Sequence, residues 1–222
     1  MLAIYADNDP VNWRLVESFA TTSSSSIVVE EIELDGFGET MRTRGFQAAL
    51  NQSEALLEQA LMQHSPDLLV VLSKGLGIVT FLAVKGLWSG PTVMLSPIPN
   101  ECDHVKGGSW EAEWKSSMEV LRSHDVGPLA IGVGSSYDEQ NLILRIMEDV
   151  GVCGDLIKAE MNYEHAMQES SAGKRSQIEN SQHHSFLQFE DCTNWIVASF
   201  PGDHFWKNLD ENAANIANLV AL

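Results

Sequence analysis

The chain has 222 residues, of which 44% are hydrophobic and 20% are charged, and this suits one globular domain, residues 1–222, with a sizeable buried core. Thirteen Lys and Arg residues against 31 Asp and Glu residues give a formal net charge of −18. A charge this negative repels the phosphates of nucleic acids and anionic membrane surfaces. We therefore expect no nucleic-acid partner, whereas a basic protein surface fits the charge.

The cysteines and the N-terminal residues bear on the compartment. Cys102, Cys153 and Cys192 are odd in number and have no C-x-x-C spacing, so they predict neither a disulfide framework nor a thiolate zinc site. The first ten residues hold two aspartates and no basic region of a secretory signal, and no apolar run reaches the roughly 18 to 20 residues of a membrane span. We expect a soluble protein in a reducing compartment, either the cytoplasm or the interior of an organelle.

Short apolar runs alternate with helical patterns, which is typical of α/β sheets. In chain order, the first half is predicted to contain a strand at 2–6, a helix at 10–19, a strand at 27–34, a closing turn at 35–38, one or two helices between 43 and 63, a strand at 67–72, a helix at 78–87 and a strand at 92–96. The alternation predicts a mostly parallel, doubly wound sheet of about six strands.

The second half continues the pattern with one interruption. It is predicted to contain a helix at 111–122, a strand at 129–133, a helix at 141–150, a strand at 195–200 and a closing helix at 210–222. Between about 154 and 190 the periodicity fades into Ser, Gln, Glu, Asn and His, which predicts a flexible polar insertion without a domain of its own.

The sharpest chemical signal lies between the strand at 67–72 and the helix that follows it. A strand that passes through Ser73-Lys74-Gly75 into a helix places the serine on a tight turn and exposes its hydroxyl beside the first amides of the helix. An ordinary β-to-α turn is the alternative reading of these three residues.

In this segment the chain resembles the α/β-hydrolase fold, in particular small cytosolic serine hydrolases. The stretch Pro66-Asp67-Leu68-Leu69-Val70-Val71-Leu72-Ser73-Lys74-Gly75-Leu76-Gly77 is similar to their nucleophile elbow, and Gly90-Pro91-Thr92-Val93-Met94-Leu95-Ser96-Pro97 to their next strand. Residues 134–139 and 202–205 fall where that family places its acid and its histidine. The resemblance thus covers nearly the whole chain.

The resemblance implies a serine esterase or thioesterase that acts on a small or acyl substrate without cofactor or metal. Its catalytic triad is Ser73 as nucleophile, His204 as base and Asp138 as the acid that orients the histidine. The oxyanion donors it implies are the backbone amide of Lys74 and the loop that contains Asn8. Asp138 also fits the N-cap of the helix at 141–150, and neighbouring Glu139 remains open as the triad acid.

Two positions depart from the family pattern. Val71 stands where the family's elbow has its first glycine, and we expect its side chain to push the following helix outward. Asp7 precedes Asn8 where the family has a His-Gly pair, and its charge disfavours a nearby oxyanion. The alternative function is therefore a catalytically weak or inactive member of the fold, which works as a binding or assembly subunit.

Other motifs are weaker. His183-His184 with Glu179 and Glu190, and the triplet at 102–104, contain metal-binding residue types without metal-site spacing, so we expect no metal. The pairs Gly75-x-Gly77 and Gly132-x-Gly134 lack the rest of a P-loop or dinucleotide fingerprint, so no nucleotide cofactor is expected either.

Overall fold

The computed structural model describes residues 1–6, 30–97, 110–134, 157–159, 186–189 and 192–200. The predicted helices at 10–19, 141–150 and 210–222 lie outside these residues. No described helix has the length and apolar character needed to cross a membrane.

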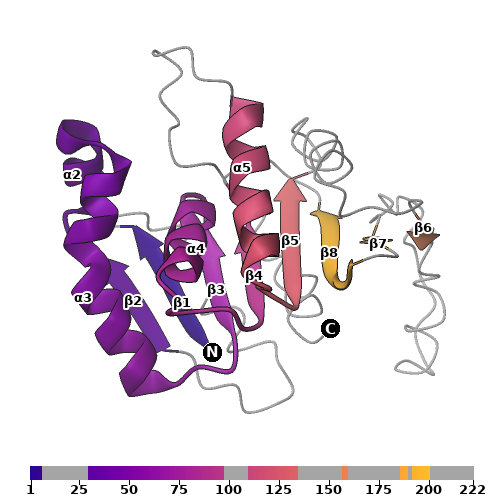
Figure 1. Ribbon diagram of the computed structural model, residues 1–222, viewed down its shortest axis with the longest axis horizontal. Helices are drawn as coiled ribbons and strands as arrows, with labels where there is room; N and C mark the ends of the chain where they lie inside the picture. The colour runs from indigo at the N-terminus through magenta and orange to yellow at the C-terminus, as the bar shows by residue number, and fades with distance from the viewer. Residues whose placement is uncertain (7–29, 98–109, 135–156, 160–185, 190–191, 201–222) are drawn as a thin grey trace, which may run out of the picture.

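Five parallel strands form the centre of the structure (Figure 1). They are β1 (Leu2–Ala6), β2 (Glu30–Leu34), β3 (Leu69–Leu72), β4 (Thr92–Leu95) and β5 (Leu129–Gly134), and their spatial order is β2-β1-β3-β4-β5. The α/β class and the parallel sheet predicted from the sequence are thereby confirmed.

The sheet continues beyond β5 with β8 (Cys192–Phe200), β7 (Phe186–Phe189) and β6 (Ile157–Ala159). β8 pairs with β5 in parallel, whereas β7 and β6 are antiparallel additions. Both short strands lie within the polar stretch at 154–190, where no strand was predicted from the sequence. The rest of that stretch lies outside the described residues.

The burial of the strands follows their place in the sheet. β3 and β4 lie at its centre and are buried at every position, which explains why their sequences are apolar without alternation. β2 is the outermost strand at its end of the sheet and alternates, with Glu31 and Glu33 exposed and Ile32 and Leu34 buried. Among the described strands β2 forms this edge of the sheet, and charge on an edge strand opposes pairing with another chain.

Four helices lie on the same face of the sheet (Figure 1): α2 (Phe37–Arg44), α3 (Phe46–His64), α4 (Gly75–Val84) and α5 (Trp110–Ser123). They connect β2 to β3, β3 to β4 and β4 to β5, which are steps in one direction across the sheet. Right-handed crossovers in one direction put their helices on one face. Helices on both faces, as a doubly wound sheet requires, remain a prediction.

The region between β2 and β3 holds two helices, but the range 43–63, where one or two helices were predicted, is occupied by α3, and α2 precedes it. Gly45, at a φ of 92°, separates α2 from α3, and this backbone conformation suits glycine. α2 begins at Phe37, within the stretch predicted to be a closing turn. The rings of Phe37 and Phe46 meet edge to face with centroids 5.4 Å apart, which fixes the corner between the two helices.

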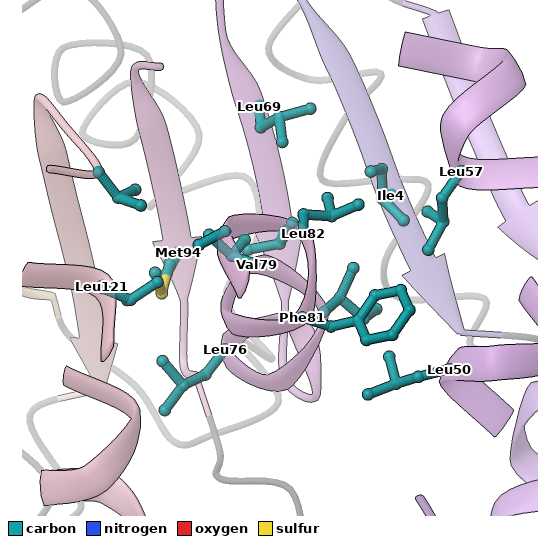
Figure 2. Close-up of a cluster of buried hydrophobic side chains, with 14 of the residues drawn as sticks. Ile4, Leu50, Leu57, Leu69, Leu76, Val79, Phe81, Leu82, Met94 and Leu121 are labelled. Atoms are coloured by element: carbon teal, nitrogen blue, oxygen red, sulfur yellow. The ribbon is translucent and has the colours of Figure 1, made fainter. Parts of the chain in front are cut away.

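α4 is the centre of the core. It is buried around most of its circumference, because it packs on the sheet with α3 on one side and α5 on the other. Figure 2 shows Phe81 directed toward Leu50 of α3, while Val79 lies beside Met94 of β4. An apolar helix of this kind fixes its first residues firmly against the ends of β3 and β4.

Candidate functional site

Ser73 lies on a two-residue connection between the end of β3 and the start of α4, so the predicted strand-turn-helix arrangement is confirmed. Its φ is 48°, in the left-handed region that non-glycine residues rarely adopt. The Ser73 amide donates to the Leu95 carbonyl of β4 at 3.0 Å. The chain therefore makes a sharp, strained turn at Ser73 between the strand and the helix.

Val71 is fully buried directly beneath the start of α4. A Cβ built on Gly75 would lie 2.3 Å from the Val71 Cβ, far inside van der Waals contact. Gly75 therefore provides the space that the valine occupies, and the close approach of strand and helix is achieved with one glycine. The outward displacement expected from the sequence is not needed to accommodate Val71.

The N-terminus of α4 faces the turn that carries Ser73. Lys74, the N-cap residue, makes no side-chain cap, and the first turn contains no acidic side chain. The Lys74 carbonyl accepts hydrogen bonds from Gly77 at 3.1 Å and from Ile78 at 3.4 Å, so its peptide belongs to the first turn of the helix. The partial positive charge of this helix end lies next to Ser73 and favours a developing negative charge.

Ser96 has a left-handed φ similar to that of Ser73 at the end of the neighbouring strand, and it was not among the site residues predicted from the sequence. It directly follows β4, has a φ of 41° and is only 2% exposed. Its amide donates to the Gly132 carbonyl of β5 at 2.8 Å. Ser96 comes directly after an apolar strand, as Ser73 does, and this repeated sequence feature was the signal available for it.

The remaining predicted site residues, Asn8, Asp138 and His204, lie outside the described residues, as do Asp7 and Glu139. The strands before them are described: β1 ends at Ala6, β5 at Gly134 and β8 at Phe200. All three run parallel to β3, so their carboxyl ends lie at the edge where Ser73 lies.

The weaker metal candidates at 102–104, 179–184 and Glu190 also fall outside the described residues. Within the part of the chain that the structure describes, no three His, Cys, Asp or Glu side chains gather in a way that could hold a metal ion.

Comparison with known proteins gives no assignment for this arrangement. The chain matches no protein-family model, no curated protein and no solved structure.

Proposed function

We propose that the protein is a serine hydrolase that cleaves a carboxylic ester or thioester of a small or acyl substrate, with Ser73 as the nucleophile. The observation that carries this proposal is the left-handed φ of Ser73 at the turn from a central parallel strand into a buried helix. Strained non-glycine residues concentrate at functional sites, because folding alone seldom selects them. The turn also lies at the carboxyl edge of the sheet, where open α/β sheets bind their ligands.

The proposed reaction divides into acylation and deacylation. His204 removes the Ser73 proton as Ser73 Oγ attacks the substrate carbonyl, and Asp138 stabilises the imidazolium. The oxyanion accepts from the Lys74 amide and from the loop that contains Asn8, and collapse expels the alcohol or thiol, which takes the proton from His204. Water then attacks the acyl group by the same steps and releases the acid and free Ser73.

Strand spacing supports this assignment of partners. In the order β3-β4-β5-β8, β5 lies two strands from β3 and β8 lies three strands away, which is roughly 10 and 14 Å at about 4.8 Å per strand. Asp138 follows the end of β5 by four residues, and His204 follows the end of β8 by four. Four extended residues span about 13 to 14 Å, so both loops are long enough to return toward Ser73.

A fluorophosphonate probe tests the proposal, because it phosphonylates activated serines and leaves ordinary hydroxyls unlabelled. The native protein is expected to take one label, and Ser73→Ala is expected to take none. Ser116→Ala, which removes an exposed serine from α5, is the matched control and should label at the native rate. Hydrolysis of p-nitrophenyl acetate should disappear in Ser73→Ala and persist in Ser116→Ala.

The alternative function, an inactive binding or assembly subunit of the same fold, gives the opposite result. A folded native protein without label or turnover would support that alternative, especially if Asp7→Gly combined with Val71→Gly restored turnover. Labelling that persists in Ser73→Ala would remove Ser73 as the nucleophile.

A further inference from the structure

We infer that Ser96 is a positioning residue for Ser73, acting through the backbone that joins the ends of β3, β4 and β5; this rests on the proposed function of Ser73. Two serines with left-handed φ, 48° at Ser73 and 41° at Ser96, lie at the carboxyl ends of adjacent parallel strands. The last paired residues of these strands are Leu72 and Leu95, and Ser73 and Ser96 directly follow them.

One peptide unit connects the two serines. The Leu95 carbonyl accepts from the Ser73 amide at 3.0 Å, and the amide of the same Leu95-Ser96 peptide donates to the Gly132 carbonyl at 2.8 Å. The orientation of this peptide therefore fixes where the Ser73 amide points. Because hydrogen bonds in such a chain polarise one another, each one holds the next in place.

The conformation of Ser96 determines how this peptide ends. β4 ends at Leu95, and Ser96 has its left-handed φ immediately after the peptide that holds Ser73. A residue that resists positive φ at position 96 shifts the Leu95-Ser96 peptide toward extended geometry and rotates the carbonyl that Ser73 needs. Ser96 is only 2% exposed, so its neighbours allow little other adjustment.

The strained turn at Ser96 helps to hold the strained turn at Ser73 in place. The nucleophile must hold its position closely, since a displacement of about 1 Å can cost on the order of 100-fold in rate. Two contacts hold the turn at Ser73. Val71 packs closely against Gly75, and the carbonyl of the Leu95-Ser96 peptide accepts a hydrogen bond from the Ser73 amide. The turn at Ser96 thus holds the peptide that the Ser73 amide bonds to, which residues of the Ser73 turn itself do not do.

A series at position 96 tests the inference through the backbone preference of each residue. Glycine and asparagine tolerate positive φ, alanine tolerates it less well, and valine resists it most strongly. We expect Ser96→Gly and Ser96→Asn to keep the native rate of fluorophosphonate labelling. Ser96→Val should label about 10- to 100-fold more slowly, with Ser96→Ala between them, and this milder variant preserves the test if the valine variant does not fold.

Two further readouts separate positioning from a general loss of structure. Turnover of p-nitrophenyl acetate by Ser96→Ala should show a lower kcat with a nearly unchanged KM. Amide hydrogen exchange at Ser73 should accelerate in Ser96→Val and Ser96→Ala and stay native in Ser96→Asn. Ser65→Val, at the left-handed C-cap of α3, is the matched control, because it strains a similar φ of 40° and should change neither the labelling rate nor Ser73 exchange.

Native Ser73 exchange in a folded Ser96→Val or Ser96→Ala variant would overturn the inference. Slow labelling in Ser96→Gly and Ser96→Asn would also overturn it, since the Ser96 hydroxyl rather than the backbone would then be responsible. A native protein that takes no label removes the proposed hydrolase activity instead, and amide exchange then decides by itself whether Ser96 holds the Ser73 turn.

Discussion

Gly75 of α4 lies so close to Val71 of β3 that a Cβ at position 75 would lie 2.3 Å from the Val71 Cβ. The strand carries a valine at this contact, and the helix has a glycine without a side chain opposite it. Because Val71 occupies this space, the first turn of α4 can keep its position only with glycine at position 75. Any side chain at position 75 must move α4, the strand or both.

Gly75→Ala is accordingly expected to destabilise the protein by about 1 to 3 kcal/mol, the usual range for overpacking a core. Urea unfolding of the variant measures this loss. Adding Val71→Gly to Gly75→Ala removes the clash, so the double variant should lose less stability than the two single losses added together. Additive losses would show that the two positions do not compete for the same space.

Replacing Ser73 by glycine should relieve backbone strain and thereby keep the stability of the protein while abolishing its activity. Left-handed backbone costs a non-glycine residue about 1 to 2 kcal/mol, and glycine adopts it freely, although glycine also gains entropy in the unfolded chain. We expect Ser73→Gly to unfold at the same or a higher temperature than the native protein while losing all fluorophosphonate labelling. A large loss of stability would mean that the Ser73 side chain holds the turn together.

The control for that variant is Ser65→Gly, because Ser65 has a φ of 40° at the exposed C-cap of α3. Glycine is the preferred residue at left-handed helix ends. Ser65→Gly should raise the thermal unfolding temperature and label at the native rate, which links loss of label to Ser73 alone.

The two buried tryptophans of the described core should respond differently to Phe. Trp114 is fully buried, and its Nε1 has no hydrogen-bond partner among the residues that the structure describes, whereas the Trp195 Nε1 donates to the Val126 carbonyl at 3.0 Å. Both substitutions remove similar volume, but only Trp195→Phe breaks a buried hydrogen bond. It should cost about 1 kcal/mol more than Trp114→Phe in urea unfolding. Equal losses would contradict this difference.

The ion pair between Lys85 and Glu54 joins α4 to α3, and its Nζ–Oε1 distance is 2.7 Å. The two side chains are 41% and 35% exposed, so water and salt screen their attraction. We expect Lys85→Met and Glu54→Gln each to change the free energy of unfolding by no more than about 1 kcal/mol, with a smaller change at high salt. A loss several times larger would show that the pair organises the contact between the helices.

Sequence patterns were sufficient where an element's environment is uniform along its length. β3 and β4 are buried at every position, and their apolar composition alone predicted both strands. α5 buries one face, and the spacing of its apolar residues predicted a helix within two residues of the observed bounds. The turn at Ser73 was predicted because a strand, a serine and a glycine follow one another locally.

Patterns failed where distant segments decide the structure. β6 and β7 are three and four residues long, and they are strands only because β7 pairs with β8 and β6 pairs with β7. The start of α2 was mistaken for a turn, because the glycines around Phe37 favour turns locally while the ring's burial against Phe46 depends on the tertiary structure.

The candidate site divides in the same way. The sequence by itself determined that a serine stands between a buried strand and an apolar helix, because these residues are contiguous and their local preferences agree. Only the tertiary structure decided that Gly75 accommodates Val71 and that the peptide before Ser96 holds the Ser73 amide. These contacts depend on how closely β3, β4 and α4 approach, and packing across the sheet determines that distance.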